Sequence, residues 1–70
     1  MNFINLNDTN NTNINLRKVC YYTHFNVDNQ YYIRFHFSHK LFSDVMFSKK
    51  NDLEKALEKL NSISHTHFSL

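Results

Sequence analysis

The spacing of apolar and polar positions divides the chain into a strand-like part and a helical part. Over residues 14–48 the two kinds of side chain largely alternate, and Tyr, Phe, Val and Ile are frequent, which is typical of β-strands. Over residues 51–63 the apolar side chains instead recur every three or four residues, as in an amphipathic helix. The pattern predicts one α+β domain over residues 1–70, in which three or four antiparallel strands pack against one C-terminal helix. Residues 64–70 are expected to form a loose tail.

A two-residue turn at Asp28 and Asn29 is predicted to set the register of the central hairpin, because both residue types tolerate a left-handed backbone. The expected cross-strand pairs are Phe25 with Tyr32, Thr23 with Arg34, Tyr22 with Phe35, Tyr21 with His36, and Cys20 with Phe37. The face that we expect to point to the core carries Cys20, Tyr22, Tyr31, Ile33, Phe35 and Phe37.

A third strand is expected over residues 41–47, after a three-residue turn at residues 38–40. This register places Ser43, Val45 and Phe47 on the core side, and it sets Asp44 opposite Arg34 as a cross-strand charge pair. The same residues also fit helical spacing. The strand interpretation is favoured because the run is short and rich in Phe and Val.

The first fifteen residues contain seven asparagines. Two similar apolar–polar runs, at residues 4–7 and 14–17, flank a stretch of turn-forming residues. This arrangement favours an opening hairpin, and the alternative for residues 1–13 is a frayed segment.

Composition limits the chemistry that the chain can support. It contains no glycine, no proline and one cysteine, which excludes phosphate-binding glycine loops, dinucleotide-binding turns and an internal disulfide. The sequence has neither a long apolar run nor the start of a secretory signal. We therefore expect a cytoplasmic, non-enzymatic protein without a cofactor or a membrane-spanning segment.

Individual candidates for metal binding or catalysis are weak. The five histidines are His24, His36, His39, His65 and His67, and we expect them to face solvent because their spacing does not supply three fixed ligands. Cys20 is expected to point into the core as a small hydrophobic residue. No pair of carboxylates is placed for acid–base chemistry, so the sequence predicts no catalytic, cofactor or metal site.

The second face of the predicted sheet is the candidate partner-binding surface. Its members are Tyr21, Phe25, Tyr32, Arg34 and His36. Basic support is expected from Arg17, Lys40, Lys49 and Lys50, and residues 14–50 carry six basic and two acidic side chains. Aromatic and basic groups together can stack on bases or anchor a protein interface. The alternative is a second hydrophobic layer, covered by the N-terminal segment or by the mate in a homodimer.

Part of the chain resembles the DNA-binding domains of plant ethylene-response factors and the arm-binding domains of phage integrases. The resemblance lies in residues 31–37, in residues 44–50, and in residues 53–60 with Ala56, and it covers about half of the chain. It implies a three-stranded antiparallel sheet that enters the DNA major groove and is covered by a helix with a small residue on its inner face.

Two classes of function follow from these observations. The first is an interaction protein that binds and blocks a larger host protein or nucleoprotein complex. In size and composition the chain is similar to small phage and mobile-element inhibitors of host defence, such as anti-CRISPR proteins. The second is a module that binds DNA or RNA on its sheet face, which the local positive charge and the resemblance support.

Overall fold

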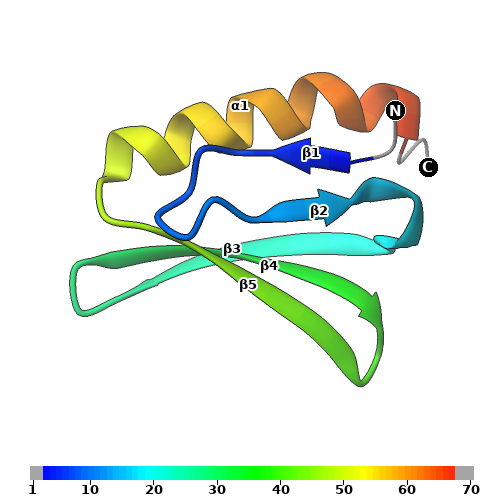
Figure 1. Cartoon of the computed structure of the whole chain (residues 1–70), viewed down its shortest axis with the longest axis horizontal. Helices are drawn as coiled ribbons and strands as arrows, with labels where there is room; N and C mark the ends of the chain where they lie inside the picture. The colour runs from blue at the N-terminus through cyan, green and yellow to red at the C-terminus, as the bar shows by residue number, and fades with distance from the viewer. Residues whose placement is uncertain (1–2, 68–70) are drawn as a thin grey trace.

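The computed structural model describes residues 3–67, with side chains up to residue 63. Strands β1 (Phe3–Asn5) and β2 (Asn13–Asn15) form a two-stranded antiparallel sheet, and a 3₁₀ turn, η1 (Leu16–Lys18), follows them. A second antiparallel sheet contains β3 (Tyr21–Val27), β4 (Gln30–Ser38) and β5 (Leu41–Phe47) in chain order, and helix α1 (Lys50–His67) completes the fold. The α+β class predicted from the sequence is confirmed (Figure 1).

The hairpin of β3 and β4 has the predicted turn and register. Asp28 and Asn29 adopt positive φ angles of 49° and 67°, as a two-residue hairpin turn requires. The register pairs Phe25 with Tyr32, Thr23 with Arg34, Tyr22 with Phe35, and Tyr21 with His36. Because side chains alternate between faces, this register sends Ile33 and Phe35 into the core.

The prediction that Cys20 points into the core and pairs with Phe37 across the hairpin is wrong. Strand β3 begins one residue later, at Tyr21, and Cys20 is exposed. Its backbone N–H donates to the carbonyl of His36 at 2.8 Å, and its thiol donates to the carbonyl of Phe37 at 3.3 Å. Cys20 therefore lies where the chain leaves η1 and enters the edge strand β3, and its side chain is exposed.

Strand β5 confirms the strand interpretation of residues 41–47. Arg34 pairs with Asp44, and Val45 and Phe47 are buried. The turn differs from the prediction, because Ser38 pairs with Leu41 and the turn itself contains only His39 and Lys40. A register irregularity between His36 and Ser38 absorbs the extra residue as a bulge at Phe37, which leaves the rest of the predicted register unchanged.

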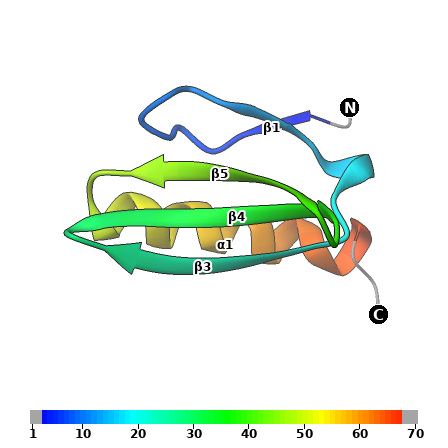
Figure 2. The same ribbon diagram turned by 90° about the horizontal axis from the view of Figure 1, so that it is seen from below.

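One core joins the two sheets and the helix. Helix α1 covers one face of the three-stranded sheet, and the β1–β2 hairpin lies beside β5 (Figures 1 and 2). The buried apolar residues are Ile4, Leu6, Ile14, Leu16 and Val19 of the N-terminal part, Ile33, Phe35, Val45 and Phe47 of the sheet, and Leu53, Ala56 and Leu60 of the helix. Residues 3–15 therefore form a hairpin that supplies part of the core.

Several polar contacts tie this hairpin to the rest of the molecule, among them one of 3.3 Å between the hydroxyls of Thr9 and Ser48. The N–H of Thr9 donates to the carbonyl of Met46 at 2.9 Å, on the outer edge of β5. The ammonium of Lys59 donates to the carbonyl of Asn5 at 3.1 Å, from helix to strand. Backbone and side chain thus fix the hairpin at the sheet edge and against α1.

Asparagine and aspartate form the loop between β1 and β2 without any glycine. Asn7 and Asn11 have φ angles of 58° and 53°, in the left-handed region. Asn5 Oδ1 accepts from the N–H of Asn7 at 2.8 Å, and Asp8 Oδ1 accepts from the N–H of Thr12 at 2.7 Å. Asparagine tolerates the left-handed region at Asn7 and Asn11 without glycine, and the side chains of Asn5 and Asp8 satisfy backbone N–H groups of the loop.

Helix α1 is longer than the sequence pattern predicted. It begins at Lys50 and runs to His67, so residues 64–67 are helical rather than a loose tail, and residues 68–70 lie outside the described part of the chain. The apolar periodicity ends at Ile63, but no glycine or proline follows to stop the helix. Within the described residues, no helix is both long and apolar enough to cross a membrane.

Candidate functional site

The outer face of the three-stranded sheet, which points away from α1, is the candidate site. The register arranges its side chains in rows that run across all three strands. One row is Tyr21, His36 and Phe42, the middle row is Thr23, Arg34 and Asp44, and the third row is Phe25, Tyr32 and Met46. All five residues predicted for the partner-binding face lie together on this surface.

The aromatic rings of the outer rows stack across the strands. Tyr21 and His36 are nearly parallel, with ring centroids 4.1 Å apart and an interplanar angle of 8°. Phe25 and Tyr32 are 5.1 Å apart at 17°. The ring of Phe42 continues the first row at 6.1 Å from His36, at 46°. Stacked cross-strand rings of this kind stabilise the pairing of the strands.

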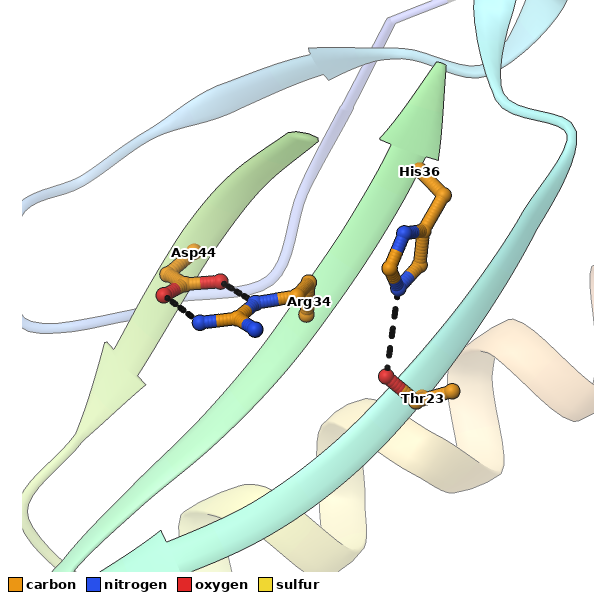
Figure 3. A network of polar contacts seen from close by, with 4 residues as sticks. All are labelled: Thr23, Arg34, His36 and Asp44. Carbon is orange, nitrogen blue, oxygen red and sulfur yellow. Dashed lines mark hydrogen bonds and ion pairs between the residues drawn. The ribbon is translucent and has the colours of Figure 1, made fainter. Parts of the chain in front are cut away.

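Arg34 occupies the centre of the face and is bound on several sides. Its Nε donates to Asp44 Oδ1 at 2.7 Å and its Nη2 donates to Asp44 Oδ2 at 2.9 Å (Figure 3). The guanidinium carbon also lies 5.0 Å from the Phe25 ring centroid and 4.1 Å from that of Phe42. The hydrogen bonding to Asp44 raises the pKa of Arg34, with the carboxylate charge adding to the effect and desolvation opposing it. The two-pronged geometry fixes the guanidinium in one plane.

The face is therefore aromatic and close to neutral. The charge of Arg34 is matched by Asp44, and these two side chains remain 34% and 31% exposed. Thr23 and His36 add a polar contact of 3.4 Å between Oγ1 and Nε2 (Figure 3). On this face, Tyr21 and Phe42 are the most accessible rings, at 52% and 49% exposure.

This charge balance gives a direct prediction. Replacing Asp44 by asparagine leaves the guanidinium of Arg34 uncompensated, so the variant should elute from a heparin column at higher salt than the unmodified protein. Glu54→Gln is the matched control, because it removes one negative charge from the exposed side of α1. If both variants shift equally, net charge alone decides the elution and the local role of the pair is excluded.

The structure does not gather the predicted basic residues on the outer face. Arg17 lies in η1 and Lys40 in the β4–β5 turn, at one end of the sheet. Lys49 and Lys50 lie beyond the other end of β5, which at about 3.3 Å per residue is roughly 23 Å away. All four are exposed, and they flank the aromatic surface at opposite ends without forming one positive patch.

Two residues of the face were missed in the sequence interpretation. Phe42 and Met46 belong to its outer rows, yet they were not selected. The signal was present, because the prediction that Ser43, Val45 and Phe47 face the core places residues 42, 44 and 46 on the opposite side. From that alternation, the sequence interpretation assigned only Asp44 to the side of Arg34.

The idea that the N-terminal segment covers this face is wrong. Its apolar side chains, including Ile4 and Ile14, join the core cluster that contains Ile33 and Phe35, on the helix side of the sheet. Burial of these side chains in the shared core keeps the hairpin on that side, and the Thr9–Met46 hydrogen bond holds it alongside β5 rather than across the outer face. Figure 2 shows the sheet from its outer side, with α1 behind it and the hairpin at the β5 edge.

The described histidines lie on different parts of the fold. His24 is on the inner side of β3, His36 is on the outer face of β4, and His39 is in the β4–β5 turn. Within the part of the chain that the structure describes, no three His, Cys, Asp or Glu side chains group in a way that could hold a metal ion. The side chains of His65 and His67 lie outside that part.

Comparison with known proteins gives no relative from which a role could be transferred: no protein-family model, curated protein or solved structure matches this chain. The functional argument therefore depends on the outer face itself.

Proposed function

We propose that this protein is a small interaction module that binds a larger protein through the outer face of the β3–β4–β5 sheet and acts by occupying that partner's surface. The observation that carries the proposal is the array of half-exposed, mutually stacked rings around Arg34, which is already neutralised by Asp44. Tyrosine and arginine held rigidly at the centre of a face are the residues that most often dominate binding energy in protein interfaces.

The geometry favours a protein partner over a nucleic acid. Asp44 holds the Nε–Nη2 edge of Arg34 and compensates its charge, so a phosphate would be left with the other edge of a guanidinium whose charge is already matched. Bases stack on open ring faces, whereas Tyr21 already stacks on His36, and Phe25 on Tyr32. The basic residues lie at the ends of the sheet and do not form one surface for phosphates. Nucleic-acid binding is the alternative outcome of the test below.

The mode of action that we propose is steric. A domain of 70 residues is small beside most of the protein complexes it could meet, and binding alone is enough to block a surface of such a complex. Small phage and mobile-element inhibitors of host defence, such as anti-CRISPR proteins, work at this size. We place the proposal in that class by analogy of scale and surface.

Affinity capture from a lysate of the source cells or their host, with and without nuclease, tests the proposal. The unmodified protein is compared with a Tyr21→Ala/Phe42→Ala variant of the face and with a Glu54→Ala/Glu58→Ala control on the exposed side of α1. We expect a protein partner that survives nuclease treatment and is retained by the control. With that partner purified, the face variant should bind about 30-fold more weakly, corresponding to about 2 kcal/mol.

The salt dependence of binding separates the two classes of partner. A protein interface centred on a neutral face should lose little affinity between low and physiological salt. If the captured partner disappears with nuclease, or if affinity falls steeply with salt and falls less steeply in an Arg34→Ala/Lys49→Ala variant, the module binds nucleic acid and the proposal is wrong.

A further inference from the structure

A hollow lies between the β1–β2 hairpin and the first half of β5. Its volume is about 430 Å³, and four apolar side chains line it, those of Phe3, Ile14, Phe37 and Leu41. Among the described residues, Lys18 is the one charged member of the lining, and the others carry short polar side chains. None of the lining residues belongs to the rows of the outer face, so the hollow is separate from the candidate partner-binding surface.

The attachment of the hairpin to β5 is uneven along the strand. Contacts from Thr9 hold the hairpin to Met46 and Ser48, at and just beyond the end of β5. Leu41 and Ser43, which line the hollow, are at the beginning of the strand. Within the described part of the chain, no hydrogen bond joins the hairpin to either residue. The hairpin and the main sheet are therefore bonded at one end and separated by the hollow at the other.

The apolar side chains give the hollow a buried floor and an exposed rim. On the floor, Ile14 is 4% exposed and Phe37 is partly buried against the core. On the rim, Phe3 and Leu41 are 58% and 61% exposed. Single exposed apolar residues are ordinary on protein surfaces, but a concave site with apolar walls is typical of small-molecule binding. An apolar chain bound there would remove both rim residues from water, which is favourable.

The charge beside the hollow is positive. Lys18 is exposed, and within the described residues it has no hydrogen-bond or ion-pair partner. None of the described lining residues is acidic, and two further cations, Arg17 and Lys40, lie at the same end of the sheet. The complementary occupant is therefore an apolar chain that carries one negative group at its end.

We propose that this hollow binds a free aliphatic carboxylate with a single unbranched chain of about eight to twelve carbon atoms. The chain lies on the floor of the hollow and between its two rim residues, and the carboxylate accepts a hydrogen bond from the ammonium of Lys18. Small-molecule sites usually have volumes of about 300–1,000 Å³, and this one accommodates a single chain of that length but not a two-chain membrane lipid. Such a site goes beyond the proposed function, because it uses no residue of the outer face.

The bound ligand would bridge the two layers of the fold. It contacts the hairpin through Phe3 and Ile14, and it contacts the main sheet through Phe37 and Leu41. Because it fills the space where the described layers are not bonded to each other, it binds the folded chain and not the unfolded one. The melting temperature should therefore rise with the concentration of the ligand.

Decanoate is the probe, titrated into the full chain while the backbone amide signals are followed by NMR. We expect saturable binding with a dissociation constant below about 1 mM, shifts centred on Ile14, Phe37 and Leu41, and a rise in Tm. Decyltrimethylammonium has the same chain and the opposite charge, and it should bind at least about threefold more weakly than decanoate.

Two variants at exposed positions separate the charge from the apolar contacts. Lys18→Met keeps an unbranched side chain without its charge, and it should weaken decanoate about three- to fivefold while leaving decanol binding unchanged. Leu41→Asn makes the rim polar, and it should weaken both decanoate and decanol about fivefold. The matched controls, Lys55→Met and Val27→Asn, change exposed residues outside the hollow and should bind decanoate like the unmodified protein.

Several outcomes would overturn the proposal. One is decanoate binding that does not saturate by about 1 mM, and another is equal affinity for decanoate and decyltrimethylammonium. A third is an equal effect of Lys18→Met and Lys55→Met on decanoate. If decanoate leaves the amide signals of the hollow unchanged while a protein partner shifts them, the hollow belongs to a protein interface and the proposal is wrong.

Discussion

Replacing Phe35 by alanine is expected to lower the free energy of unfolding by about 3–5 kcal/mol. Phe35 is on the central strand β4, its side chain is 0% exposed, and it belongs to the core that joins the sheet, the helix and the N-terminal hairpin. Removing its ring leaves a cavity between the sheet, the helix and the hairpin, and these elements cannot all move to fill it. Urea denaturation followed by circular dichroism measures the loss.

The size of that loss matters because a domain of this length has little stability in reserve, often about 5–10 kcal/mol in total. Phe42→Ala is the matched control, since it removes the same ring from the outer face, where it is 49% exposed. Its cost should be about 1 kcal/mol. Equal losses for the two variants would show that the inner and outer faces have been assigned incorrectly.

Replacing Ile14 by alanine is expected to cost about 2–4 kcal/mol. Ile14 is buried, it faces Ile4 across the β1–β2 pair, and both belong to the same core as Phe35. An asparagine-rich opening that merely frayed would tolerate the change. The experiment therefore measures whether residues 3–19 unfold together with the sheet. The denaturation curves of Ile14→Ala and Phe35→Ala should each keep a single transition.

The control for this prediction lies on the same hairpin. Phe3 is 58% exposed, and Phe3→Ala should change the free energy of unfolding by about 0.5 kcal/mol or less. Hydrogen exchange gives an independent check, because the N–H of Thr9 bonded to Met46 should exchange only when the hairpin opens. An Ile14→Ala variant as stable as the unmodified protein would show that the hairpin contributes no cooperative stability.

The parts of the fold that could be predicted from the sequence are those set by local backbone chemistry. Asp28 and Asn29 determine a tight turn, and a tight turn fixes every pair along β3 and β4. A short turn after β4 then extends the register to β5 and sets Asp44 opposite Arg34. By contrast, the exposure of Cys20 depends on how η1 leads the chain into β3, and the bulge at Phe37 depends on how β4 and β5 close around the turn of His39 and Lys40. No short-range pattern encodes either geometry.

The position of the N-terminal hairpin relative to the main sheet could not be predicted from the apolar–polar pattern either. The alternation at Ile4 and Ile14 indicated strands with one apolar side, but it did not indicate which face or edge of the main sheet they would meet. That choice depends on long-range contacts, including the one from Thr9 to Met46. The helix end was missed for a different reason, because apolar spacing marks where a helix is buried rather than where it stops.

For the candidate site, the sequence located the surface better than it described its chemistry. Alternation was enough to place Tyr21, Phe25, Tyr32, Arg34 and His36 on one face. It could not show that Arg34 would be held in plane by Asp44 with Phe25 and Phe42 beside it, because this depends on rotamers in three strands at once. That arrangement changes the expectation from a basic surface to a nearly neutral one.

The left-handed turns of asparagine and aspartate also affect the unfolded chain. Glycine loses more backbone freedom on folding than any other residue, and this protein places Asn7, Asn11, Asp28 and Asn29 at positions where glycine is the usual solution. With no glycine anywhere in 70 residues, the denatured ensemble has fewer conformations to give up. A domain too small for a large core thus gains part of its stability from a less flexible unfolded state.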